Sequence, residues 1–268
     1  FQLETIDQFR PKVSAILNIT EDHLNRHHTM EEYIRVKELI TKNQGPEDVC
    51  VLNYEDEVLR KFGENIVPKV VYFSSLRKLD RGIYLDGDQI ILKTEKEEIP
   101  IVKTGELKIL GRHNHENVMA AAAMAYYAGV SVESIRRSVC EFVAVPHRIE
   151  YVTEKNGVAY YNDSKGTNPD AAIKGIQAMN RPTLLIGGGK VCYLVLIGQT
   201  KEKIKAAAER LGFTDIILCE DLKEAVRVCA EKANPGDAVL LSPACASWGQ
   251  FDNYEQRGDM FKEYVKAL

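Results

Sequence analysis

Residues 156–169 have the sequence NGVAYYNDSKGTNP, and this stretch decides the fold of the second half of the chain. Asn156-Gly157 is the signature of a tight hairpin turn between two strands. Asn168-Pro169 is a helix-start signal, because Asn caps a helix and proline is tolerated in its first turn. The stretch therefore predicts a strand, a polar junction and a helix in direct succession.

The same alternation continues after this stretch. Apolar runs typical of strands are separated by helical segments, and they cover residues 183–186, 194–197, 215–218 and 238–242. Such alternation predicts an α/β fold with a mostly parallel, helix-covered sheet of Rossmann-like type. Ligands of these sheets bind at the carboxyl ends of strands, and three polar motifs follow predicted strands: Asn162–Lys165, Gly187–Lys190 and Ser242–Cys245.

The first half of the chain has a different pattern. Residues 13–17 predict a buried strand, and a capping box at 29–32 predicts a helix to about Lys42. Short β-branched runs between residues 48 and 102 predict a strand followed by a small antiparallel sheet.

Two helices are expected next, an Ala-rich one over 114–127 and one from the Ser131 cap to about residue 142. Pro146 has the character of a hinge, so we expect one domain over 1–146 and a second over 147–268.

Composition excludes several classes of protein. Of the 268 residues, 45% are hydrophobic and 28% charged, as in ordinary globular proteins. A net charge of −4, from 35 basic and 39 acidic residues, argues against nucleic-acid binding. The longest apolar stretch without a charge, 118–130, is shorter than the ~20 residues of a membrane span, so we expect no membrane segment.

Cysteine usage and the first residues bear on the cellular compartment. The six cysteines include no C-x-x-C pair, which argues against a zinc knot and a secreted disulfide framework. We therefore expect a cytoplasmic protein in which most cysteines are buried. The chain starts at Phe1 with neither an initiator Met nor a signal segment, so we expect it to begin in mid-protein.

The glycine-rich segment Gly187–Lys190 is not a nucleotide phosphate loop. That motif requires a glycine five residues before Gly189 and a hydroxyl residue after Lys190, where this chain has Leu184 and Val191. The segment remains either a turn that lets the backbone approach a ligand or a plain tight turn.

Other motifs in the first half have a functional and a purely structural interpretation. Residues 20–28 offer oxygen and imidazole ligands suited to magnesium and phosphate, or they form a solvated polar loop. Lys37 has the spacing of an ordinary surface residue of a helix. Asn114 and Asn117, three apart at a helix start, suit the edge of a purine or merely cap the helix.

Two motifs near the predicted domain junction complete the set. Arg148 in the sequence Pro-His-Arg stabilises a phosphate in one interpretation and forms a hinge ion pair in the other. The density of donors in 162–169 at a strand–helix junction is hard to explain by packing and favours a functional role.

Together these motifs resemble those of the Mur ligases. The resemblance covers nearly the whole chain and rests on six segments: FQLE at 1–4, NITEDH at 18–23, GRHN at 111–114, PHR at 146–148, NDSKGTN at 162–168 and LSPACAS at 241–247. It implies the remainder of a central P-loop-type ATPase domain, without its phosphate loop, followed by the Rossmann-like C-terminal domain that receives the amino acid. Family members have a longer connection after Lys190, so we expect a missing loop there.

The resemblance also implies roles for individual residues. Glu4, His23 and a carbamylated Lys37 would hold Mg²⁺, with Lys37, His23 and Arg148 in catalytic roles. ATP would be bound by Asn114, Asn117, Arg148 and Asp163. The amino acid would be bound by Lys165, Thr167, Lys190, Ser242 and Phe251.

The implied activity is ATP-dependent amide formation in peptidoglycan precursor synthesis. The DSKGTN and SPACAS segments imply UDP-N-acetylmuramoyl-L-alanine and D-glutamate as substrates, and we expect a monomer. Two alternatives remain, namely another Mur-type or folate-type amino-acid ligase, and a catalytically incomplete nucleotide-binding fragment.

Overall fold

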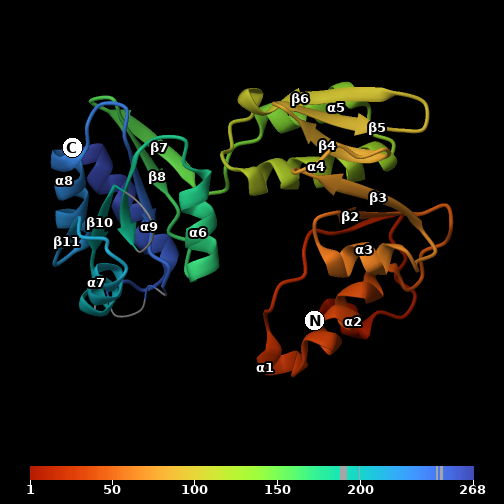
Figure 1. The fold of residues 1–268 in the computed structure, drawn as a ribbon, viewed down its shortest axis with the longest axis horizontal. Helices are drawn as coiled ribbons and strands as arrows, with labels where there is room; N and C mark the ends of the chain where they lie inside the picture. The colour runs from red at the N-terminus through yellow and green to blue at the C-terminus, as the bar shows by residue number, and fades with distance from the viewer. Residues whose placement is uncertain (188–191, 199, 246, 248–249) are drawn as a thin grey trace. The chain divides into compact units, whose positions relative to one another are not determined.

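The computed structural model describes residues 1–268 except 188–191, 199, 246 and 248–249. The chain divides into two compact units (Figure 1). The first unit contains Phe1–Lys108 and Arg112–Phe142, and the second contains Ile109–Gly111 and Val143–Leu268. The domain boundary at residue 146 stays a prediction.

Within the described residues, the first unit is built on a six-stranded sheet with strands in sequence order. The strands are β1 (Val13–Ile16), β2 (Val49–Asn53), β3 (Lys69–Ser74), β4 (Gly82–Asp86), β5 (Gln89–Lys93) and β6 (Glu98–Lys103). The pairs from β1 to β4 are parallel, and those from β4 to β6 are antiparallel.

The expected small antiparallel sheet is confirmed as the pairing of β4 with β5 and of β5 with β6, but these strands continue the parallel part of the sheet. β4 joins the parallel strands through the pairs Phe73↔Ile83 and Ser74↔Tyr84. Gly82 permits this approach, because a methyl group there would overlap the carbonyl oxygen of Tyr72. The two parts therefore form one continuous sheet.

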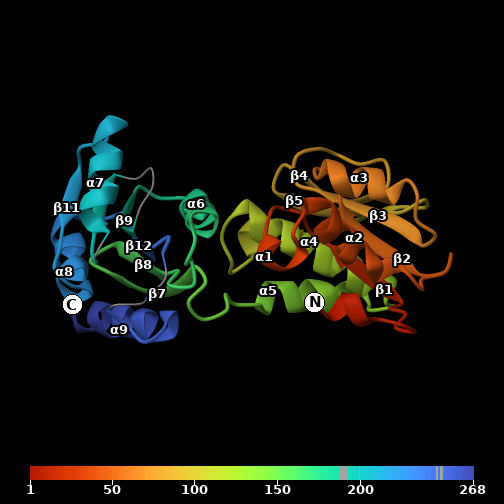
Figure 2. The same cartoon turned by 90° about the horizontal axis from the view of Figure 1, so that it is seen from below.

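Helices cover both faces of this sheet (Figure 2). They are α1 (Leu24–His27), α2 (Met30–Glu38), α3 (Glu57–Gly63), α4 (Arg112–Tyr127) and α5 (Val132–Glu141), with 3₁₀ turns at Gln2–Thr5, Leu39–Thr41 and Thr104–Glu106. Cys50 and Leu52 pack with α2 and α3. Val51 points to the opposite face and is equally buried.

The predicted helix starts are confirmed by their caps. The Thr29 hydroxyl accepts a hydrogen bond from the Glu32 amide at 3.2 Å, and Ser131 accepts one from the Ser134 amide at 3.3 Å. The first of these helices is shorter than expected, since α2 ends at Glu38 and continues as a 3₁₀ turn.

The second unit has the predicted mostly parallel sheet, in the order β11-β10-β9-β12-β8-β7. Its strands are β7 (Glu150–Lys155), β8 (Val158–Asn162), β9 (Thr183–Gly187), β10 (Tyr193–Leu196), β11 (Ile216–Leu218) and β12 (Ala238–Ser242). Only the β7–β8 hairpin is antiparallel among the described pairs. Asn156 and Gly157 at its turn have φ of 53° and 77°, as a tight hairpin requires.

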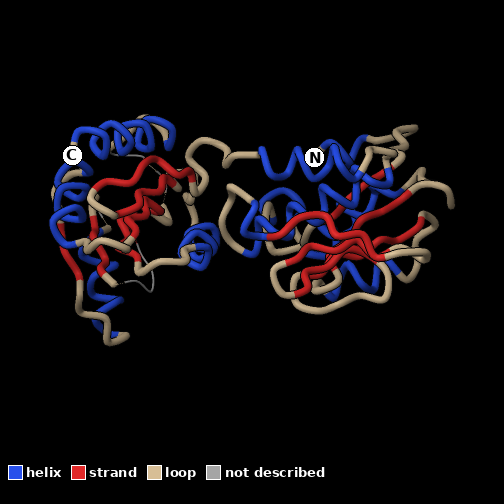
Figure 3. The backbone as a smooth tube through the Cα atoms, turned by 90° about the horizontal axis from the view of Figure 1, so that it is seen from above, coloured by secondary structure: helices blue, strands red, loops and turns tan. Residues whose placement is uncertain are grey.

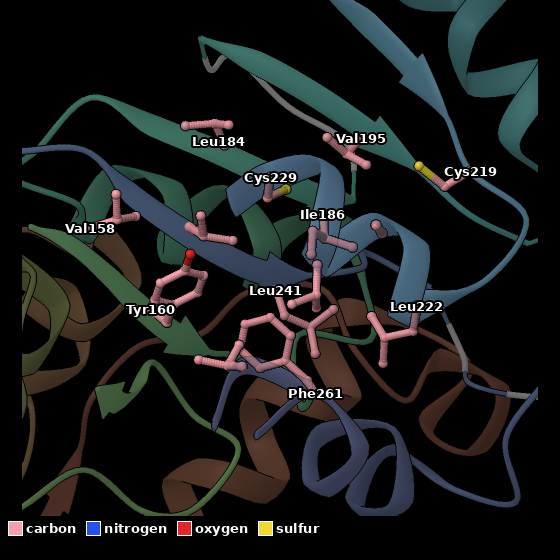
Figure 4. Close-up of a cluster of buried hydrophobic side chains, with 14 residues drawn as sticks. Val158, Tyr160, Leu184, Ile186, Val195, Cys219, Leu222, Cys229, Leu241 and Phe261 are labelled. Atoms are coloured by element: carbon pink, nitrogen blue, oxygen red, sulfur yellow. The ribbon is translucent and has the colours of Figure 1, made fainter. Parts of the chain in front are cut away.

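Helices surround the strands of this sheet (Figure 3), namely α6 (Pro169–Ala178), α7 (Lys201–Arg210), α8 (Leu222–Lys232) and α9 (Tyr254–Ala267). On one face, Tyr160 and Leu241 pack against Phe261 of α9 (Figure 4). On the other face, Leu185 and Leu240 pack with Ala178 of α6. These two cores fix the strand ends on which the polar motifs lie.

The cysteines follow the expectation only in part. Cys50, Cys219 and Cys229 are buried, whereas Cys140 is half-buried and Cys192 and Cys245 are exposed. Burial raises the pKa of the Cys50 and Cys219 thiols to about 11, and raises that of Cys229 as well. The expectation that most would be buried was therefore wrong.

As to membrane insertion, among the described residues no helix is both apolar and long enough to traverse a bilayer.

Candidate functional site

Three neighbouring parallel strands of the second unit bring polar residues to one edge of the sheet. β12 lies between β8 and β9, and the pairs Leu241↔Asn162 and Ser242↔Gly187 align their carboxyl ends. The loop after β8 therefore lies beside the loop after β12, and the Ala244 amide donates to the Gly166 carbonyl at 2.9 Å. The sequence motifs at 162–165 and 242–245 belong to one site.

Asp163 is the buried acid of this site. Its Oδ2 accepts a hydrogen bond from the Ser242 hydroxyl at 2.7 Å, and its Oδ1 accepts one from the Ile149 amide at 3.2 Å. Burial raises the pKa of Asp163 from 3.8 to about 6, although these two donors and the Arg148 charge oppose the shift. Ser242 has no exposed surface, so its hydroxyl serves Asp163 in this arrangement.

The raised pKa predicts a pH-dependent stability that Asp163→Asn removes. The folded protein binds this proton more tightly than the unfolded chain, so the contribution of Asp163 is present below pH 3.8 and is lost as the pH rises to about 6. The loss amounts to about 3 kcal/mol. Urea unfolding from pH 4 to pH 7 should show the wild type losing stability relative to the variant, and parallel curves would contradict the assignment.

Arg148 lies on a strained segment beside Asp163. His147 and Ile149 on either side of it have φ of 65° and 46°, which is costly for a β-branched residue such as Ile149. The segment is held by the Ile149 amide on Asp163, by the His147 amide on Glu150 at 2.9 Å, and by the Lys165 amide on the His147 carbonyl at 2.9 Å. This leaves the Arg148 side chain exposed next to the buried acid.

The other predicted residues of the second unit lie around the same strand ends. Lys165 is exposed, with its Nζ 5.6 Å from the centroid of the Tyr254 ring, and Thr167 is half-buried. Phe251 is half-buried and lines a cavity. Lys190 lies outside the described residues, and so does the loop expected to be missing after it.

The cavity beside these loops measures about 240 Å³. It lies at the ends of β9, β10 and β12, where residues such as Gly187, Leu196 and Leu241 line it. Its polar lining includes Ser247 and Arg257. A cavity of this volume suits a small ligand.

Sequence reasoning missed Arg257 of α9. This side chain is only 3% exposed, and its guanidinium donates to the Ser164 hydroxyl, the Ser164 carbonyl and the Cys245 carbonyl. A usable signal was its spacing, because Arg257, Phe261 and Val265 follow each other at i, i+4 and i+8 on the buried face of α9.

In the first unit, Glu4 is held by basic neighbours. The Arg26 guanidinium donates to both of its carboxylate oxygens at 3.2 and 2.6 Å, and Nδ1 of His27 lies 3.6 Å from it. The hydrogen bonds from Arg26 lower the pKa of Glu4. His23 belongs to the same group, since its ring lies 5.2 Å from that of Phe1 while Arg26 lies over the Phe1 ring.

Lys37 lies near the end of α2 and is half-buried. Its Nζ is 3.5 Å from the Asn18 carbonyl, just after β1, and 4.9 Å from the centroid of the Tyr33 ring. Its side chain therefore reaches the carboxyl end of β1 and the NITEDH segment.

Asn114 and Asn117 lie in the first turns of α4. The Asn117 amide donates to the Asn114 side-chain oxygen at 3.4 Å, so the two amides share one side of the helix as their spacing predicted. Asn117 is exposed and Asn114 half-buried.

The donors of the first unit fit a magnesium site in part. Among the described residues, no three His, Cys, Asp or Glu side chains form a cluster that could hold a metal ion. Magnesium usually takes only one or two protein carboxylates besides phosphate oxygens and water, and Glu4 can supply one of them. Glu4 would have to exchange its Arg26 partner for the metal.

The sequence is similar to that of known proteins, over part of the chain for a family model and over the whole chain for curated relatives. Residues 1–125 match the family model of the Mur ligase middle domain. The UDP-N-acetylmuramoylalanine-D-glutamate ligase of Lachnoclostridium phytofermentans is 56% identical over 284 residues, covering 100% of this chain and 63% of the relative. The enzyme of that name from Clostridioides difficile is 46% identical with the same coverage. The chain thus spans less than two thirds of the curated relatives that it matches.

Solved structures show the same fold at low identity. UDP-N-acetylmuramate-alanine ligase MurC from Thermotoga maritima has a TM-score of 0.69 and 18% identity, over 96% of this chain and 60% of that one. MurF ligase from Thermotoga maritima in complex with ADP has a TM-score of 0.65 and 18% identity, over 96% of this chain and 63% of that one.

Proposed function

The chain belongs to the Mur ligase family, and from this premise we propose that it acts in the ATP-dependent joining of D-glutamate to UDP-N-acetylmuramoyl-L-alanine. The observation that carries the proposal is the 56% identity, along the whole chain, to a ligase named for this reaction. The place of action would be the cytoplasm, in peptidoglycan precursor synthesis, and the protein would act as a monomer.

The chemistry requires activation of a carboxylate. If the amine attacked the carboxylate of UDP-N-acetylmuramoyl-L-alanine directly, the leaving group would be oxide. The carboxylate therefore first attacks the γ-phosphorus of ATP and gives an acyl phosphate and ADP. The amine of D-glutamate then attacks the acyl carbon, and the tetrahedral intermediate collapses to amide and phosphate. The protein contributes positioning of the reactants and stabilisation of the transferring charge.

In the second unit, Arg148 and Asp163 would meet the nucleotide. The exposed guanidinium of Arg148 suits the transferring phosphoryl group, and the Asp163 carboxylate, held by Ser242 and Ile149, suits a ribose hydroxyl. D-glutamate would be bound by Lys165, Thr167, Lys190, Ser242 and Phe251, of which Phe251 lines the 240 Å³ cavity.

In the first unit, Asn114 and Asn117 would meet the adenine. Glu4, His23 and a carbamylated Lys37 would hold Mg²⁺, which supplies neutralisation of phosphate charge when bound. The Lys37 Nζ lies 3.5 Å from the carbonyl of Asn18, the first residue of the NITEDH segment, which supports its place in this group.

The test is phosphate release by the complete gene product that contains this chain. We expect release with ATP, UDP-N-acetylmuramoyl-L-alanine and D-glutamate together, and none when any one is omitted. Absence of release with all three would contradict the proposal. The same assay on residues 1–268 alone measures whether this part suffices.

A different amino-acid specificity within the family is the second candidate. Its support is the similarity of the fold to family members with other named substrates, such as the alanine ligase. A panel of D-glutamate, L-glutamate, L-alanine and meso-diaminopimelate in the phosphate assay separates the candidates. Preference for an amino acid other than D-glutamate would replace the first proposal.

A further inference from the structure

Arg257 is a buried cation that links two loops of the candidate site. It projects from the first turn of α9 and is 3% exposed. Within the described residues its guanidinium forms no ion pair with a carboxylate, and its acceptors are the Ser164 hydroxyl and the Ser164 and Cys245 carbonyls. Burial lowers the pKa of its guanidinium, because desolvation disfavours the charged form. A buried charge of this kind needs its hydrogen-bond partners, and these acceptors lie in the two loops.

The loop after β8 supplies two of the acceptors through Ser164. Arg257 Nε donates to the Ser164 hydroxyl at 2.9 Å, and Nη2 donates to the Ser164 carbonyl at 2.8 Å. The same hydroxyl donates to the Tyr254 carbonyl at 2.7 Å, and the Ser164 amide donates to Asn162 at 3.1 Å. Ser164 is thus fixed at its amide, its hydroxyl and its carbonyl.

The loop after β12 supplies the third acceptor. Arg257 Nη1 donates to the Cys245 carbonyl at 3.3 Å. The neighbouring Ala244 has φ of 57°, an unfavourable conformation for a residue with a side chain, and its amide donates to the Gly166 carbonyl at 2.9 Å. Arg257 therefore spans the gap between two loops that also contact each other directly.

We propose that Arg257 is a positioning residue that sets the places of Asp163 and Lys165 through Ser164, the residue between them. This inference rests on the proposed function, in which Asp163 meets the nucleotide and Lys165 meets D-glutamate. The planar guanidinium directs its three groups at three acceptors simultaneously, whereas a lysine ammonium at the same place reaches fewer of them. Loss of the three Arg257 hydrogen bonds therefore weakens the binding of ATP and of D-glutamate together.

The central experiment compares Arg257→Lys and Arg257→Met in the complete gene product. We expect the KM for D-glutamate and the KM for ATP to rise together by about tenfold in both variants, with kcat reduced less than about threefold. A purely structural role would lower the folded fraction, and hence apparent kcat, at unchanged KM. That second pattern would overturn the proposal.

Two further variants make the test specific. Ser164→Ala removes the hydroxyl that Arg257 Nε contacts. The double variant Ser164→Ala with Arg257→Met should therefore have KM values no higher than those of Arg257→Met alone. Additive effects of the two substitutions on KM would contradict the proposal that Arg257 acts through Ser164.

Arg227→Met is the matched control, because Arg227 is an exposed arginine of α8 paired with Glu231. The KM values of this variant should stay at those of the wild type.

Hydrogen exchange separates this inference from the proposed function. In Arg257→Lys, the amides of Lys165 and Ala244 should exchange faster, while the amides of Leu240 and Leu241 inside β12 stay protected. Unchanged exchange at Lys165 and Ala244 would overturn the positioning role whatever the substrate. A wild type that releases no phosphate with D-glutamate would overturn the proposed function alone.

Discussion

Replacing Lys37 with alanine is expected to lower the rate of phosphate release by about 10³-fold, the size of effect seen when a stabiliser of transferring charge is removed. In the unmodified state the Lys37 ammonium lies near the Asn18 carbonyl and the Tyr33 ring. Once it has lost a proton, the neutral Lys37 amine could attack carbon dioxide and release a second proton, which gives a carbamate whose oxygens suit magnesium. Alanine supplies neither form, and the measurement is steady-state phosphate release at saturating substrates.

Chemical rescue identifies the carbamate in particular. Short carboxylic acids such as acetate or formate should restore part of the activity of Lys37→Ala, because they return a carboxylate to the vacated space. The control is Lys61→Ala, which removes an exposed lysine of α3 paired with Glu57 and should leave the rate unchanged. Full activity of Lys37→Ala without any added acid would exclude a carbamate role.

Replacing Gly187 with alanine is expected to destabilise the protein by about 3–5 kcal/mol, the sum of backbone strain and overpacking. Gly187 ends β9 with φ of 149°, which favours glycine, and a methyl group there would overlap the carbonyl oxygen of Ser242 on β12. The clash is with backbone, so it cannot be relieved by rotation of a side chain. Urea unfolding of the two proteins measures the difference.

Gly212→Ala is the control for conformational strain alone. Gly212 also has a positive φ, of 82°, but a methyl group there would meet no atom within 4 Å. The free energy of unfolding of Gly212→Ala should fall by about 1 kcal/mol, the cost of a left-handed backbone for a residue with a side chain. Equal losses in the two variants would show that close packing of β9 against β12 does not matter.

The strands of the second unit were predictable because continuous apolar runs of four to five residues suit strands that are buried on both faces. The runs at 183–186 and 238–242 correspond to β9 and β12. In the first unit, the apolar runs did not predict that β4 pairs in parallel with β3. That pairing depends on the absence of a side chain at Gly82, which strand patterns do not reveal. The short helix α3 was missed, although Asp56 caps it with bonds to the Val58 and Leu59 amides.

The candidate site was predictable where its residues adjoin strand ends. The donors of 162–168 form a connected site with Ser242, which follows from the parallel pairing of β8 with β12. Arg257 belongs to no recognised motif and arginine is usually exposed, so its spacing with Phe261 and Val265 was the only sequence signal of burial. Its hydrogen-bond partner Ser164 lies 93 positions away in the sequence, and such contacts exist only in the folded chain.

Because Cys245 is exposed, a fluorescent label on its thiol can monitor the loop that Arg257 holds after β12. Its thiol is accessible, while its own carbonyl is the acceptor of Arg257 Nη1. With Cys140 and Cys192 changed to serine, the remaining thiols, Cys50, Cys219 and Cys229, are shielded from alkylating reagents. A fluorophore attached at Cys245 would then report arrival of an amino acid as a change in emission, without any turnover.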